Sequence, residues 1–170
     1  MDLCFLQNEA CRHLFFYEEF GMTEVEVVDA ILSYNMSDDL LDDKVRIPII
    51  LFVCGSRCYD CSLIIHTIMA SRTPVYTVNI GYCYDEAFLV FASGAKRFAL
   101  NKYSVFSFMG TNLSDAPGWQ EIVELRGLTP ICKEYAEIED MHAEEALEHK
   151  VVTKVLGSIG ELELERQGDE

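Results

Sequence analysis

The feature that most constrains the fold is an unbroken apolar run in the first third of the chain. Residues 47–53 read Ile-Pro-Ile-Ile-Leu-Phe-Val, with no charged or amide side chain among them. A half-exposed strand alternates apolar and polar residues, whereas a strand that is covered on both faces has a continuous apolar sequence. The run is far shorter than the roughly 20 residues that a membrane-spanning helix needs. It therefore predicts a central strand of a parallel sheet with helices on its faces.

Strand and helix patterns alternate on both sides of this run. Aromatic and β-branched residues predict further strands at 13–17, 74–80, 98–100, 104–109 and 151–156. Apolar residues at helical spacing predict helices at 23–34, 59–70, 86–94, 120–125 and 143–148. Successive β-α-β units of this kind imply an α/β fold with a largely parallel sheet.

Two charged segments interrupt or follow this pattern. Residues 35–43 are rich in aspartate, which predicts a solvent-exposed connector. Residues 161–170 are charged and poor in apolar residues, which predicts a frayed tail.

Composition excludes several classes of function. The 170 residues include 13 Lys and Arg against 29 Asp and Glu, a formal net charge of −16, so we expect no nucleic-acid partner and no docking on an anionic membrane. The first residues lack the basic and apolar regions of a signal peptide. Seven cysteines, several of them in apolar runs, indicate reduced thiols. These features predict a cytoplasmic protein.

Seven segments, taken in order, resemble the proteolytic subunit of the Clp proteases (peptidase S14), which has the ClpP/crotonase fold. They are residues 14–17, 44–49, 55–65, 74–81, 87–92, 94–100 and 141–148. The most specific match is 94–100, which reads Gly-Ala-Lys-Arg-Phe-Ala-Leu. The resemblance implies a single domain over residues 1–160 with repeated β-α-β units. It also implies that the family's handle region is shortened here, at 110–139.

At the positions that the resemblance assigns to the family's catalytic triad, this chain has residues that cannot perform the triad's chemistry. The nucleophilic serine follows a glycine like Gly81 by four residues, at a strand-to-helix elbow, and that position is Asp85. The general-base histidine position is Phe108, which has no proton-transfer chemistry. The orienting aspartate position is Ile138, or Asp140 if the local alignment shifts. No intact triad is therefore expected.

The substrate-binding loop of the family is also altered. A glycine pair offers backbone amides to the oxyanion there, and this chain has Gly55 followed by Ser56 and Arg57. Side chains at these positions crowd a backbone that has to approach the peptide closely. The changes predict a pseudoprotease, and they leave Asp85 a simpler role as the N-cap of the next helix.

Other groups of residues invite chemical interpretations. Three cysteines have C-x₃-C-x₂-C spacing, which is typical of iron–sulfur ligation, with His66 as the nearest fourth ligand for zinc: Cys54, Cys58 and Cys61. Because they coincide with the glycine loop and the helix after it, we interpret them as packed thiols and predict no metal and no cofactor. Cys83, with His66 or His142 as its base, is a candidate displaced nucleophile, but its place at the end of a strand favours a structural thiol.

Two further interpretations concern carboxylates and histidines. Asp85 and Glu86 suggest carboxylate chemistry on acyl thioesters, although adjacent residues at a helix start point in different directions. Three histidines are predicted to be solvent-exposed: His13, His142 and His149.

The sequence thus predicts a catalytically inactive ClpP-like protein that works through assembly, as a non-catalytic ring subunit or scaffold. Its expected partners are copies of itself or active ClpP-type subunits in a mixed ring. The shortened handle predicts weak stacking of rings, and the lack of a long N-terminal segment argues against an AAA+ unfoldase partner. The alternatives are a relocated acyl-thioester hydrolase or hydratase site on the same fold, or residual peptide hydrolysis.

Overall fold

A parallel sheet forms the centre of the computed structural model, which describes residues 12–17, 21–40, 46–55, 61–107, 118–128 and 140–167. The strands are β1 (His13–Tyr17), β2 (Ile49–Gly55), β3 (Val75–Tyr84), β4 (Lys96–Ala99), β5 (Val105–Ser107), β6 (Met141–His142) and β7 (Lys154–Val155). The helices are α1 (Glu24–Leu40), α2 (Ser62–Ala70), α3 (Asp85–Ser93), α4 (Trp119–Arg126), α6 (Ala143–Glu148) and α7 (Ile159–Gln167).

The strand order is β1-β2-β3-β4-β7, and each neighbouring pair in this path is parallel. The end of β3 pairs in parallel with β5, and β6 joins β5 as an antiparallel strand. The α/β fold with a largely parallel sheet is therefore confirmed. Among the described residues, no helix has the length and apolar character needed to cross a bilayer.

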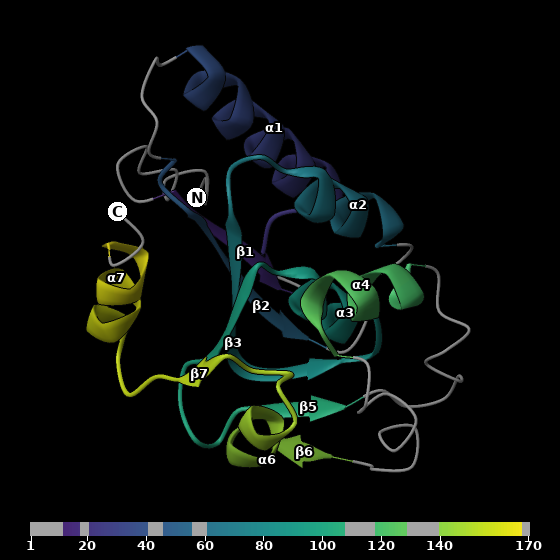
Figure 1. Ribbon diagram of the computed structural model, residues 1–170, viewed down its shortest axis with the longest axis vertical. Coiled ribbons are helices and arrows are strands. Elements are labelled where there is room, and N and C mark those ends of the chain that lie inside the picture. Colours follow the sequence, from purple (N-terminus) through teal and green to yellow (C-terminus); the bar gives the residue numbers. More distant parts are fainter. Residues whose placement is uncertain are drawn as a thin grey trace.

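The helices cover the two faces of the sheet unequally. Figure 1 shows α1, α2, α3 and α4 on one side and α7 by itself on the opposite side. Strand β2 explains why both faces need apolar residues. Ile49, Leu51 and Val53 face the larger core, whereas Ile50 and Phe52 face the smaller one. The continuous apolar run thus reflects burial on both faces.

Helix α1 is longer than the sequence pattern predicted. It continues to Leu40, so the prediction of an exposed connector from residue 35 is wrong over 35–40, and 41–43 lie outside the described residues. The side chain of Asn35 is buried, and its Nδ2 donates to the carbonyl of Ile31 at 2.8 Å. Its Oδ1 accepts from the backbone amides of Arg72 and Thr73. These tertiary contacts compensate for the low helix propensity of the segment.

The end of the chain also differs from the expectation. Residues 161–167 belong to α7, whose Leu162 is fully buried, so the prediction of a frayed tail is wrong for them. Strand β3 is longer than predicted because it passes through Gly81 to Tyr84, and β7 is restricted to two residues.

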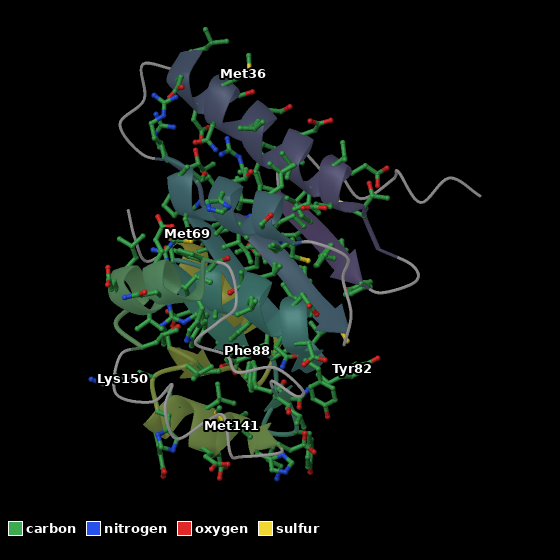
Figure 2. The ribbon with its side chains drawn as sticks, turned by 90° about the vertical axis from the view of Figure 1, so that its right-hand side faces the viewer. Met36, Met69, Tyr82, Phe88, Met141 and Lys150 are labelled. Atoms are coloured by element: carbon green, nitrogen blue, oxygen red, sulfur yellow. The ribbon has the colours of Figure 1, made fainter. Side chains whose placement is uncertain are left out.

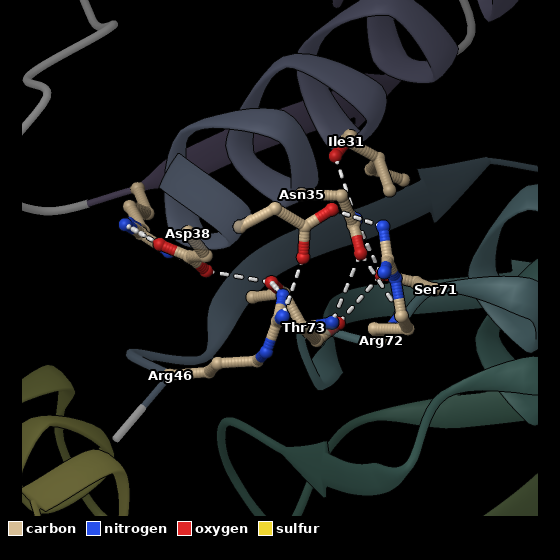
Figure 3. A network of polar contacts seen from close by, with 9 residues as sticks. Ile31, Asn35, Asp38, Arg46, Ser71, Arg72 and Thr73 are labelled. Atoms are coloured by element: carbon tan, nitrogen blue, oxygen red, sulfur yellow. Dashed lines mark hydrogen bonds and ion pairs between the residues drawn. The ribbon is translucent and has the colours of Figure 1, made fainter. Parts of the chain in front are cut away.

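A buried ion pair ties α1 to the amino-terminal ends of the strands (Figure 3). Arg12 donates to both carboxylate oxygens of Asp38, at 2.7 and 2.5 Å, and also to the carbonyl of Ile47 at 3.1 Å. The hydroxyl of Thr73 donates to Asp38 at 2.6 Å. Arg12, Ile47 and Thr73 precede β1, β2 and β3, respectively. The Asp38–Arg12 pair therefore connects the beginnings of three strands.

These contacts control the protonation of Asp38. Burial on its own raises the pKa of the Asp38 carboxyl. Hydrogen bonds from Arg12 and Thr73, together with the positive charges of Arg12 and Arg46, lower the pKa by more than burial raises it. The net result is a pKa below the ordinary value.

Replacement of Asp38 is expected to destabilise the protein strongly. Asp38→Ala leaves the Arg12 guanidinium buried without its carboxylate, which should lower the free energy of unfolding by about 3 kcal/mol in chemical denaturation at pH 7. Asp39→Ala is a matched control, because Asp39 is an exposed neighbour that pairs with Arg46 and Arg72. Its loss should cost less than about 1 kcal/mol. Equal effects of the two substitutions would contradict the assignment.

The contribution of Asp38 should also depend on pH. Because its pKa is lower in the folded state than in the unfolded state, the stabilisation is present above the unfolded pKa of about 3.9 and disappears as the pH falls through the folded pKa. Denaturation of wild type and Asp38→Asn, which mimics the protonated acid, should therefore converge in acid and diverge near neutral pH. A difference that is constant over this range would contradict the assignment.

Candidate functional site

The carboxyl ends of three parallel strands meet at one edge of the sheet. Gly55 at the end of β2 is in register with Cys83 of β3, and Ser107 at the end of β5 is in register with Tyr84 of β3. Ligand and catalytic sites of open α/β sheets lie at such edges. The structure therefore brings the start of the predicted substrate loop to within two residues of Asp85, the predicted nucleophile position.

Asp85 lies at a sharp turn from strand to helix. Its φ is +51°, a left-handed conformation that is rare outside glycine, whereas the preceding Tyr84 is extended with φ −120° and ψ 149°. A strained strand-to-helix turn of this kind is the geometry that exposes a nucleophile in α/β hydrolases. The prediction that Asp85 is the N-cap is wrong, because Tyr84 occupies that position and Asp85 is the first residue of α3.

A second positive φ lies beside this elbow. Gly55 has φ +136°, a conformation that strongly favours glycine, and the register of β2 shifts between Val53 and Gly55. Gly55 itself still pairs with Cys83 of β3, so the irregular stretch lies directly before the end of β2. The backbone at the site thus keeps a conformation that favours glycine at the position where the resemblance places the start of the family's glycine loop.

Asp140 also reaches the elbow. Strand β6 pairs with β5 so that Met141 lies opposite Phe106, which places Asp140 at the end of β3. The pKa of Tyr84 is raised by burial and further by the charge of Asp140 and by the hydrogen bond that the phenol donates to its carboxylate. Of the two candidates for the orienting position, Asp140 is therefore next to the elbow, where it binds Tyr84.

The sequence reasoning did not identify the aromatic part of this site. The rings of Tyr82 and Tyr84 lie 5.3 Å apart, and Tyr82 projects outward from the sheet, with 41% of it exposed (Figure 2). Two tyrosines at alternate positions, directly before the predicted helix at 86–94, were the available signal. The extension of β3 beyond Gly81, which was not expected, puts both tyrosines on a strand.

Several of the predicted positions are not among the described residues. Phe108, Ile138, Ser56, Arg57 and Cys58 lie outside the described residues, so their assignments remain predictions. The same holds for the ends of the predicted handle, residues 110–117 and 129–139.

The described cysteines, Cys54, Cys61 and Cys83, are in the reduced thiol form. Cys83 is completely buried, and its Sγ lies 3.5 Å from the carbonyl oxygen of Val53. His66, a predicted base, is exposed on α2, where its Nδ1 lies 2.6 Å from the carbonyl oxygen of Ser62. His142 is exposed on β6. Within the part of the chain that the structure describes, no three His, Cys, Asp or Glu side chains are grouped so that they could hold a metal ion.

The most specific sequence match, at 94–100, supports the fold rather than the site. Arg97 is buried and donates to the carbonyls of Val151, Gly94 and Lys150. Its burial and the charge of Arg126 lower its pKa to about 10. Arg97 thus holds the turn between α6 and β7 against β4.

Comparison with known proteins identifies the fold. No family model matches this sequence, and no curated protein matches it. Among solved structures, ClpP1 from Listeria monocytogenes matches with TM-score 0.59 and 16% identity, over 86% of this chain and 92% of that chain. A peptidase from Plasmodium falciparum matches with TM-score 0.63 and 17% identity, over 88% and 97%.

A putative enoyl-CoA hydratase/isomerase from Acinetobacter baumannii matches with TM-score 0.64 and 12% identity, over 85% of this chain and 69% of that chain. Both ClpP-type and crotonase-type structures therefore share this architecture. The chain has the ClpP/crotonase fold, as its sequence resemblance implied.

The backbone strain at the elbow can be measured. Asp85→Gly should be more stable than Asp85→Ala by about 1 kcal/mol, because both remove the carboxylate and only glycine adopts φ +51° freely. At Glu86, the next residue of α3, the order should reverse by about 0.5–1 kcal/mol, since alanine is favoured in a helix with ordinary φ. Chemical denaturation of the four variants tests this, and alanine being favoured at both positions would exclude a left-handed Asp85.

Proposed function

We propose that this chain is a catalytically inactive ClpP-like protein that acts through assembly with copies of itself or with active ClpP-type subunits. The observation that carries the proposal is Asp85 at a strained strand-to-helix elbow beside Gly55. The backbone has the shape that presents a nucleophile, and the side chain on it is a carboxylate.

Chemistry at this position argues against peptide hydrolysis. A serine hydroxyl gains nucleophilicity when a base removes its proton, and a carboxylate has no such proton to lose. Its attack on an amide would form an anhydride and would need an acid to protonate the leaving amine. The base position in the sequence is Phe108, which cannot supply that proton.

An exposed apolar stripe supports the assembly part of the proposal. Val25, Leu32, Met36 and Leu40 follow each other on α1 at intervals of seven, four and four residues, which places them on one side of the helix. They are 60%, 50%, 68% and 86% exposed, and Met36 points away from the sheet in Figure 2. Contiguous exposed apolar residues of this kind mark protein contact surfaces.

The absence of peptidase activity is the first expected result. The purified protein should neither cleave a fluorogenic peptide nor react with a fluorophosphonate probe, while an active Clp-type subunit measured in parallel should do both. Turnover that is abolished by the probe would show a functional serine nucleophile and overturn the proposal.

Assembly is tested by mass. Light scattering should show a mass above that of one chain, for the protein alone or mixed with an active Clp-type subunit. Leu32→Glu with Met36→Glu should shift it toward the monomer. Leu125→Glu, at an exposed leucine of α4, serves as a matched control. A strict monomer under both conditions would exclude assembly, whatever the peptidase assay shows.

A second candidate is an acyl-thioester hydrolase or hydratase on the same fold. It is favoured by the likeness to a putative enoyl-CoA hydratase/isomerase and by the approach of Asp140 to the elbow at Tyr84. Titration calorimetry with acyl-CoA should detect binding if this candidate is correct, and Asp85→Asn and Asp140→Asn should change turnover.

A further inference from the structure

The outer face of β3, β5 and β6 carries polar and aromatic side chains beside the elbow. Cys83, Phe106 and Met141 belong to the larger core, and side chains alternate along a strand, so their neighbours lie on the opposite face. These neighbours are Tyr82 and Tyr84 of β3, Val105 and Ser107 of β5, and His142 of β6. Asp140, directly before β6, joins them through its hydrogen bond with Tyr84. The outer face thus lies outside both apolar cores.

Two tyrosines and one carboxylate form the centre of the outer face. The rings of Tyr82 and Tyr84 are tilted by 53°, with their centroids 5.3 Å apart. The Tyr84 phenol donates to the Asp140 carboxylate and so holds that carboxylate beside the rings. A carboxylate accepts up to about four hydrogen bonds, so Asp140 keeps acceptor capacity for a ligand. Tyr82 and Asp140 are both exposed, and the group is therefore accessible from solvent.

The charge around the outer face is negative. Asp85 and Glu86 follow Tyr84 directly in the chain, and the whole protein has a formal net charge of −16. The face of an aromatic ring attracts cations, and so does a carboxylate. A ligand with a positive charge is therefore the chemical class that this surface favours.

The same pair of residue types already binds an arginine elsewhere in this chain. The Arg12 guanidinium lies 5.1 Å from the centroid of the Tyr34 ring, while both of its terminal nitrogens donate to Asp38. A planar guanidinium stacks on a ring and donates to a carboxylate at the same time, whereas a lysine ammonium is a strongly hydrated point charge. Tyr84 and Asp140 thus offer a ligand the two groups that Tyr34 and Asp38 offer Arg12.

We propose that the outer face binds an arginine side chain of a partner polypeptide. The guanidinium stacks on the rings of Tyr82 and Tyr84 and donates to the Asp140 carboxylate. An arginine within a polypeptide is favoured over the free amino acid, because the net charge of −16 repels the free α-carboxylate. The site uses neither the apolar stripe on α1 nor chemistry at Asp85. It is therefore independent of assembly through that stripe and of catalysis at the elbow.

Nuclear magnetic resonance on the full chain tests the proposal with a blocked peptide, acetyl-Gly-Gly-Arg-Gly-Gly-amide. Binding should be saturable and should shift the amide signals of residues 82–86 and 140–142. The same peptide with citrulline, which has a similar shape and no charge, should bind at least about fivefold more weakly. The lysine peptide should fall between the two. Equal binding of the arginine and citrulline peptides overturns the proposal, as do shifts confined to other parts of the chain.

Matched variants separate this site from the overall negative charge. Tyr82→Leu and Asp140→Asn should each weaken binding of the arginine peptide at least about fivefold. Tyr103→Leu is the control for the ring, since Tyr103 is also exposed and has Nζ of Lys102 5.1 Å from its ring centroid. Asp29→Asn, at an exposed position of α1, is the control for the charge. Both controls should stay within about twofold of wild type, because they lie outside the site.

The four substituted positions are exposed, so the variants should fold, and cooperative thermal unfolding verifies this. Equal weakening by Asp140→Asn and Asp29→Asn would show diffuse attraction to an acidic protein and would overturn the proposal. The comparison of arginine and citrulline peptides on wild type needs no variant, so it decides the question even if one variant unfolds.

Discussion

The parallel pairing of β2 with β3 is the constraint on which the rest of the structure depends. Both strands are buried on both faces for most of their length, so they form the middle of the sheet, and each face of β2 contributes to a different core. Parallel pairing also places the same ends of neighbouring strands at the same edge of the sheet. Amino ends collect at one edge, carboxyl ends collect at the other, and the two edges acquire different roles.

The amino edge is stabilised by charge. Arg12, Asp38 and Thr73 come from segments that are distant in the sequence, and they meet because three strands begin there. The carboxyl edge instead carries backbone strain, with the left-handed Asp85 and the positive φ of Gly55 beside it. Strain at that edge is tolerated because packed strands and α3 hold the turn from both sides. The stabilising ion pair and the candidate site thus lie at opposite edges of the sheet.

Much of this could be predicted from local sequence. Apolar runs located the central strands, and the resemblance to the Clp proteolytic subunits placed Asp85 at the elbow. The resemblance also offered Asp140 as one of two orienting candidates. Predictions failed where distant residues decide the outcome. Asn35 and Asp38 appear in an acidic, polar segment, yet they are buried in a helix because Thr73 and Arg12 provide their partners. Leu162 likewise lies in a charged tail, but it finds an apolar face that no other described helix covers.

The sequence by itself determined the α/β class and the central strands, because these follow from apolar periodicity, and its resemblance to the Clp proteolytic subunits placed a carboxylate at the elbow. Only the tertiary structure decided that Asp85 is left-handed and not a cap, that Asp140 binds Tyr84, and that the end of the chain covers the second face of the sheet. The physical reason is common to all three. Each depends on strand register or on a docking contact between segments far apart in the chain, which local propensity does not encode.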